Sequence, residues 1–147
     1  ERLRDTRMLL ETGAECWVAS ASGGLPHLVP LSFGWHHGVI TLATPARYRT
    51  AQNLASNPGV KLAFGTLSDV VIVEGVAVVC DIDDVAAAAL DHFTVQGGWD
   101  PRRAEGHAII EVTPRRVLAW CRENELKGRL LMRDGRWLDE DGAEGSP

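Results

Sequence analysis

The order of short β-type runs and tight turns is the sequence feature that most constrains the fold of this chain. These runs are rich in apolar, β-branched and aromatic residues, and apolar and polar residues often alternate in them, as is typical of β-strands. They occur at 16–21, 27–35, 39–44, 60–65, 70–82 and 107–121. Most of these runs are joined by short turns and not by the regular helical crossovers of a doubly wound sheet. The sequence therefore predicts a mainly β fold with helices, in which five or six antiparallel strands form a barrel.

Helices are expected before and between these strands. The helix after the third strand should begin with Thr44 as its N-cap and Pro45 as its first residue. Asn57-Pro58 should stop it. The other two helices are expected at 2–12 and at 83–93, and an irregular loop at 94–106 should follow the latter.

Prolines and a glycine mark irregular positions in the expected strands. Pro30 cannot donate to a ladder, so the second strand should lie at a sheet edge or be bulged there. Gly75 is expected to bulge the fifth strand, and Pro114 to bend or interrupt the sixth. An Arg-Asp-Gly-Arg turn at 133–136 precedes a polar C-terminal tail, which we expect to be mobile.

Length and charge limit the classes of function. With 147 residues, the chain is expected to form a single domain covering 1–147. Its net charge of −5 argues against nonspecific nucleic-acid binding. No apolar run approaches the ~20 residues that span a bilayer. Neither nucleic acid nor a membrane is therefore an expected partner.

The cysteines and histidines give no metal signature. Cys16, Cys80 and Cys121 are widely spaced in apolar surroundings, which fits reduced, buried thiols of a cytoplasmic protein. There is no CxxC pair, so a structural zinc site is not expected. The adjacent His36 and His37 stand at a turn and are interpreted as exposed side chains. We expect no metal.

Two arginines stand where the helix after the third strand should begin. A helix N-terminus is partially positive, so a cation there is unfavourable by roughly 0.3–1 kcal/mol. A bound anion would compensate, because free N–H groups, the guanidinium groups of Arg47 and Arg49, and the Thr50 hydroxyl could hold a phosphate together. The alternative is that both arginines belong to a solvated helix face. The residues alone leave both interpretations open.

An ordered set of motifs between Cys16 and Gly75 resembles a known family. The set comprises WVASASGGLPHLVPLSFGW, GVITLAT, RYRTAQNLASNPGVKLAFG and VEGVA, with a weaker echo in HAIIEVTPRRVLAW. It resembles the split β-barrel flavoproteins related to pyridoxamine 5′-phosphate oxidase, a group that includes enzymes using the deazaflavin coenzyme F420. The pattern of Arg47, Arg49, Thr50 and Asn53 looks more like the deazaflavin-using branch. The resemblance implies a six-stranded antiparallel split barrel that pairs into a homodimer.

The resemblance also implies where a cofactor would bind. Its phosphate would lie against the helix after the third strand, and its ring along the second strand. Asn53 would orient the loop or contact the ligand. The implied cofactor-binding residues are Val29, Pro30, Leu31, Ser32, Thr44, Arg47, Arg49, Thr50 and Asn53.

The implied activity is that of an F420- or FMN-dependent oxidoreductase acting on a planar small-molecule substrate. Because the cofactor ring itself transfers the hydride, no catalytic side chain is assigned. One alternative is a protein that binds or carries a flavin, haem or tetrapyrrole on the same barrel without turnover. Another is a barrel that binds no ligand and serves as a dimeric interaction module. Two further residues have open roles: His27 as a proton donor or a plain strand residue, and Trp99 as a substrate lid or a packing residue.

Overall fold

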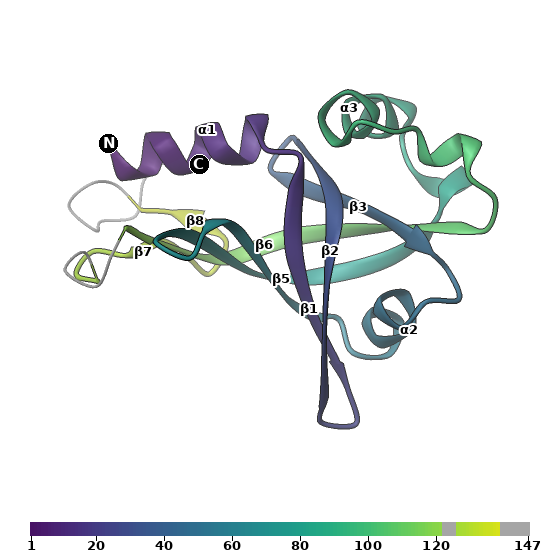
Figure 1. Ribbon diagram of the computed structural model, residues 1–147, viewed down its shortest axis with the longest axis horizontal. Helices are drawn as coiled ribbons and strands as arrows, with labels where there is room; N and C mark the ends of the chain where they lie inside the picture. The colour runs from purple at the N-terminus through teal and green to yellow at the C-terminus, as the bar shows by residue number, and fades with distance from the viewer. Residues whose placement is uncertain (122–125, 139–147) are drawn as a thin grey trace.

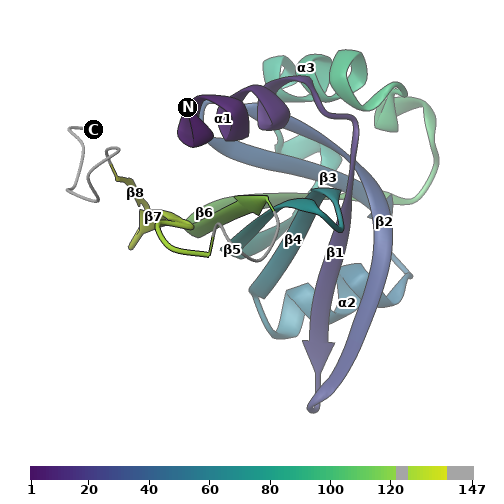
Figure 2. The same ribbon diagram turned by 60° about the vertical axis from the view of Figure 1, so that its left-hand side comes forward.

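Six antiparallel strands close into a barrel. The structure, a computed structural model, describes residues 1–121 and 126–138. Neighbouring strands follow the order β3-β2-β1-β4-β5-β6, and β3 also pairs with β6, which closes the sheet (Figure 1). Two short strands, β7 and β8, extend the sheet beyond β6 (Figure 2). The strands are β1 (Glu15–Ser22), β2 (Leu25–His36), β3 (Val39–Pro45), β4 (Gly59–Thr66), β5 (Asp69–Asp81), β6 (His107–Cys121), β7 (Leu130–Arg133) and β8 (Arg136–Trp137). The predicted fold class is confirmed.

Helices lie on two sides of the barrel. In the view of Figure 1, α1 (Arg2–Thr12) and α3 (Ala87–Gly97) lie above the strands, and α2 (Arg49–Ser56) lies beneath them. Short 3-10 turns occur at η1 (Ile82–Asp84) and η2 (Pro101–Arg103). The predicted bounds of the first helix are confirmed.

The second helix begins later than the sequence predicts. Thr44 does not cap it, because Thr44 and Pro45 are the last residues of β3 and both pair with β6. A turn follows, in which the Tyr48 N–H donates to the Pro45 carbonyl over 3.0 Å, and α2 starts at Arg49. Strand pairing with a distant segment therefore overrides the local Thr-Pro start signal.

The third helix is also displaced from its predicted position. The Asp81 carboxylate accepts the Asp83 N–H, which holds 82–84 in a separate 3-10 turn. α3 then runs to Gly97 and ends at Gly98, whose φ of 87° is the left-handed conformation that glycine adopts easily. The expected loop at 94–106 therefore begins only after Gly97.

The predicted turn is present, whereas the bulge predicted for β5 has its extra residue in β6. The register between β5 and β6 shifts between Glu74 and Gly75: Glu74 pairs with Arg116 and Gly75 with Pro114, so Arg115 of β6 is the extra residue. The bulge accommodates Pro114, so β6 continues through it without interruption. The Arg-Asp-Gly-Arg turn at 133–136 joins β7 to β8. The predicted mobile tail falls at 139–147, outside the described residues.

Most of β2 has a strand partner on one side only. Residues 25–32 pair with β1, whereas pairing with β3 is confined to 33–36. The Phe33 N–H donates to the Ala14 carbonyl of the chain just before β1. Because the N–H and C=O groups of successive residues point to opposite sides of a strand, those of odd-numbered residues in this stretch face β1 and those of even-numbered residues face the open side. Pro30 is even-numbered, and its missing N–H costs no ladder hydrogen bond. The prediction that this strand lies at an edge is confirmed.

Two apolar clusters hold these elements together. The larger one includes Val18, Phe33, Leu42 and other fully buried side chains of the strands. The smaller one joins Phe93 of α3 to Ile109 of β6. Apolar burial of this kind contributes roughly 25 cal/mol per Å².

The cysteines are only partly as expected. Burial raises the pKa of the Cys16 thiol to about 12, in keeping with a reduced core residue. Cys80 and Cys121 are half-buried, so the prediction of full burial is wrong for these two. Both stand near strand ends, where the sheet no longer covers them.

Gln96 ties three elements together. Its Oε1 accepts the Trp35 N–H over 2.8 Å, at a point where β2 extends beyond its pairing with β1. Its Nε2 donates to the carbonyls of Leu10 (2.6 Å) and Gly13 (2.8 Å) at the end of α1. One side chain of α3 thus satisfies backbone groups of both β2 and α1.

We expect Gln96→Met to destabilise the fold by about 2–4 kcal/mol, because partly buried backbone groups lose their partners. Urea unfolding followed by circular dichroism measures the change. Gln52→Met, on the exposed face of α2, is the matched control and should change stability by less than about 0.5 kcal/mol. Equal effects of the two substitutions would contradict this account of Gln96.

Candidate functional site

A groove of about 570 Å³ lies where β2 and β3 diverge. One wall is formed by β2 around Pro30, both by the side of the strand that faces into the barrel and by its unpaired edge. Another is the end of β3 together with the turn and first residues of α2, and the connection between α3 and β6 contributes Trp99. The groove therefore occupies the split in the barrel, beside the strand edge that lacks a partner.

The open edge of β2 supplies main-chain hydrogen-bonding groups to this region. The N–H of Leu28 and the carbonyls of Leu28 and Pro30 belong to even-numbered residues and face away from β1. Backbone groups of this kind require a partner when they are removed from water. Val29 and Leu31 are half-buried and give the same wall an apolar surface.

The opposite side of the groove is positively charged. Arg47 and Arg49 are exposed, and within the described residues neither forms an ion pair with a carboxylate. The Arg47 guanidinium lies 5.0 Å from the centre of the Tyr48 ring. No described aspartate or glutamate lines the groove. In a chain with net charge −5, this leaves a local site suited to an anion.

The start of α2 adds free donors to this side. Tyr48 stands at the N-cap, and no side chain caps the helix. The first backbone hydrogen bond of the helix is donated by the Gln52 N–H to the Tyr48 carbonyl over 3.2 Å. The N–H groups before it remain available, and a helix N-terminus favours negative charge.

The structure brings most of the sequence-predicted site residues together. Ser32 and Asn53 do not line the groove. Ser32 lies against Gly97 at the end of α3. Asn53 is buried, and its Nδ2 donates to the Ser20 hydroxyl over 3.2 Å, which ties α2 to β1. The predicted residues that do line the groove are Val29, Pro30, Leu31, Thr44, Arg47, Arg49 and Thr50.

Sequence reasoning did not place several groove residues among the cofactor contacts. From the sequence, His27 and Trp99 have open roles, and His107 has none assigned. Trp99 packs edge-on against both Phe93 (5.6 Å between ring centres) and His107 (5.4 Å). The additional lining residues are His27, Ala43, Pro45, Tyr48, Trp99 and His107.

Ion pairs brace the connection that carries Trp99. Arg102 bonds the carboxylate of Asp100 through Nε over 2.8 Å and that of Asp91 through a terminal nitrogen over 2.8 Å. The hydrogen bond from Arg102 lowers the pKa of Asp100 below its usual range. Arg102 is thus engaged with the protein itself and is not a groove residue.

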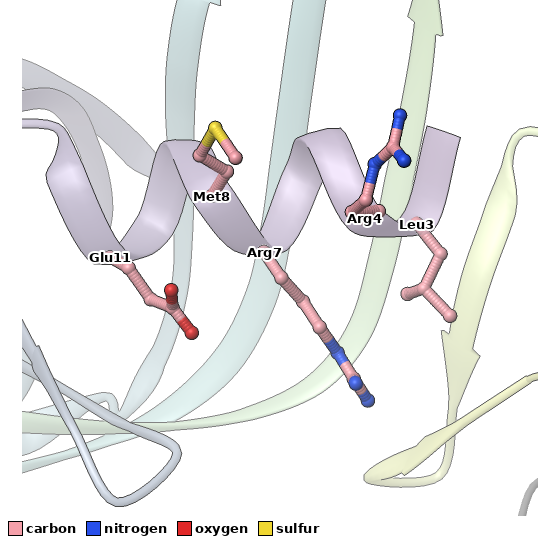
Figure 3. A pocket seen from close by; sticks show the side chains of 5 residues that line it. All are labelled: Leu3, Arg4, Arg7, Met8 and Glu11. Atoms are coloured by element: carbon pink, nitrogen blue, oxygen red, sulfur yellow. The ribbon is translucent and has the colours of Figure 1, made fainter. Parts of the chain in front are cut away.

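A second hollow, of about 370 Å³, lies on α1. Figure 3 shows Leu3, Arg7 and Glu11 pointing to one side of the helix, and Arg4 and Met8 to the other. The Arg7 guanidinium lies 5.0 Å from the centre of the Trp137 ring. All five lining residues come from one helix, so this hollow lacks the convergence of several elements seen in the groove.

Three histidines lie together away from the groove. The His36 ring lies 4.1 Å from that of His37 and 5.3 Å from that of His92. Desolvation is the largest effect that lowers the pKa of His36, and the charges of His37 and His92 lower it further. Across residues 1–121 and 126–138, no group of three or more potential ligands is arranged to hold a metal ion. No helix in the same ranges is long and apolar enough to cross a membrane.

The fold is an antiparallel barrel that is split beside one strand, with a basic groove in the split. Residues 6–121 match the family model of pyridoxamine 5′-phosphate oxidase, and the chain belongs to that family. The search of curated proteins finds no match.

Solved structures show the same fold. An F420 reductase is 19% identical, with 76% of this chain and 94% of that chain covered and a TM-score of 0.62. An FAD-binding protein from Mesorhizobium loti is 18% identical, with 80% and 91% covered and a TM-score of 0.59. A heme binding protein from Mycobacterium smegmatis is 19% identical, with 92% and 58% covered and a TM-score of 0.68.

We expect Asn53 to act on the groove through the position of α2. Asn53→Ala and Ser20→Ala should each cost about 1–2 kcal/mol of stability, because each leaves a buried polar group without its partner. In a double-mutant cycle measured by urea unfolding, the two should couple by about 0.5–1.5 kcal/mol. Additive effects would show that the contact between these side chains does not stabilise the fold.

Proposed function

We propose that this protein is an F420- or FMN-dependent oxidoreductase that transfers a hydride between the cofactor ring and a planar small-molecule substrate. The observation that carries the proposal is the groove in the split. It combines an apolar wall, an open strand edge and two arginines that have no carboxylate partner among the described residues. The F420 reductase and the FAD-binding protein with the same fold support this class of ligand.

Each part of the groove suits one part of such a cofactor. Arg47, Arg49 and Thr50 would hold the phosphate beside the start of α2, with Thr44 at the end of β3 next to it. The ring would lie along β2, where Val29 and Leu31 offer apolar contact and even-numbered peptide groups offer hydrogen bonds.

The bound cofactor would supply hydride transfer, and the protein would supply orientation and exclusion of water. The arginines would hold the phosphate end, and the wall of β2 would hold the ring. Trp99 lines one side of the groove, where it would limit the access of water. A planar substrate fits this arrangement because it can stack on a ring that is held flat.

We propose that the active form is a homodimer in the cytoplasm. Val76 and Val78 on β5 expose 40% and 59% of their surfaces, and Trp17 on β1 exposes 52%. Exposed apolar side chains on the strands of a sheet are suited to an interface between copies. Free thiols are typical of the reducing cytoplasm.

Replacing both Arg47 and Arg49 with alanine should weaken binding of FMN or F420 by several kcal/mol at most, at about 1.5–3 kcal/mol for each hydrogen bond to a charged group. Cofactor fluorescence during titration of the apoprotein measures the affinity. The matched control is Arg4→Ala with Arg133→Ala, which removes the same charge from exposed sites outside the groove. Unchanged affinity in the groove variant would contradict the phosphate assignment.

Turnover is tested with the cofactor that binds more tightly. The reduced cofactor, loaded on the protein, should be oxidised by a quinone faster than the free reduced cofactor, followed by absorbance under anaerobic conditions. Binding without any acceleration would favour a carrier over an enzyme.

A haem or tetrapyrrole carrier is the second candidate. It is favoured by His27 and His107, which place two imidazoles, common iron ligands, at a groove with arginines suited to propionates. If this candidate holds, adding haemin should produce a sharp Soret band that His27→Ala or His107→Ala reduces. A spectrum equal to that of free haemin would exclude it.

A further inference from the structure

His107 lies at the base of the turn that carries the two arginines. It pairs with Pro45 across the β3–β6 ladder. Beside it, the Gly106 carbonyl accepts the Ala46 N–H over 2.9 Å. These contacts fix the turn leading into Arg47 against the start of β6. His107 lines the same groove as Arg47 and Arg49.

The ring of His107 is held in one orientation. Its Nδ1 lies 3.2 Å from the carbonyl oxygen of Glu105. Because a carbonyl can only accept, Nδ1 carries a hydrogen in this contact. Trp99 packs edge-on against the ring, at 71° between the planes. The described residues offer no hydrogen-bond partner to the other ring nitrogen, Nε2.

We propose that His107 is a third member of the phosphate site and donates a hydrogen bond from Nε2 to an anionic oxygen of the cofactor. The inference rests on the proposed function, in which the phosphate lies beside Arg47 and Arg49. It adds a residue that neither the sequence motifs nor the resemblance assigned.

The sign of the pH dependence follows from the tautomer. With Nδ1–H bonded to Glu105, the neutral ring presents a lone pair at Nε2, which repels an anion. The protonated ring presents an N–H and a positive charge. A bound anion attracts the protonated ring and repels the lone pair of the neutral one, so the contribution of His107 to phosphate binding should be larger in acidic than in alkaline solution.

The charges around His107 make protonation and ligand binding support each other. Arg47 and Arg49 lie on the groove side. Glu105 lies two residues before it, and Asp81 of β5 pairs with the adjacent Ala108. Asp100 and Arg102 in the connection before β6 are bonded to each other. A bound phosphate adds negative charge, and the coupling is reciprocal.

The test compares wild type, His107→Gln and His27→Gln at pH 6 and pH 8. His27 lines the same groove from β2, so it is the matched control. Each protein is titrated with FMN and with F420, and with riboflavin, which lacks the phosphate. A phosphate monoester also titrates near pH 6, but it does so equally for every variant, so ratios of variant to wild type are compared at each pH. Circular dichroism verifies folding.

We expect His107→Gln to weaken binding of the phosphate-bearing cofactor about tenfold at pH 6 and about twofold or less at pH 8, as fits one charge-assisted hydrogen bond. Riboflavin affinity should not change, and His27→Gln should show no such dependence on pH. The same ratio at both pH values, or an equal loss of riboflavin affinity, would overturn the role of His107 while leaving the proposed function in place. Failure of wild type to bind FMN or F420 would overturn both.

Discussion

The pairing of β3 with two different strands, β2 and β6, is the constraint on which the rest of this structure depends. A tight turn makes 39–42 pair with 33–36 of β2, but β3 also pairs with β6 from Ile40 to Pro45. Beyond Leu42 it follows β6 alone, and the earlier part of β2 loses its second partner. An unpaired edge is a liability in most sheets, because it invites other strands. Here Pro30 removes one donor from that edge, and the groove lies beside it.

The same pairing positions the charged side of the groove. Because β3 is held by β6 up to Pro45, the chain leaves the sheet abruptly and turns before α2. Arg47 lies in that turn and Arg49 starts the helix, so their side chains reach the groove from two different backbone conformations. Asn53 then holds α2 to β1 through Ser20. The positive site thus depends on the closure of the barrel, and not on the helix alone.

Most of the strand order could be predicted from the sequence, because alternation, glycine turns and prolines are local signals. The start of α2 could not, since the Thr44-Pro45 signal is local and the pairing with His107 that overrides it comes from a segment sixty residues away. Of the residues that the resemblance implies, Arg47 and Arg49 lie at the groove, whereas Ser32 lies outside it and against Gly97 of α3. No motif assigned His107 or Trp99 to a cofactor contact, and only the topology brings them beside β3.

The wall along β2 and the charged corner of the groove differ in how they would affect ligand specificity. The wall along β2 offers main-chain groups and aliphatic surface, which many side-chain combinations can provide. Such a wall would suit any flat, conjugated guest, so under the proposed function one barrel could accept a flavin, a deazaflavin or a tetrapyrrole. The choice among them would then come from the side chains proposed to meet the charged part of the guest, which are Arg47, Arg49 and His107. A change of two or three residues at this corner would redirect the same fold to another ligand, because the core that forms the barrel does not include them.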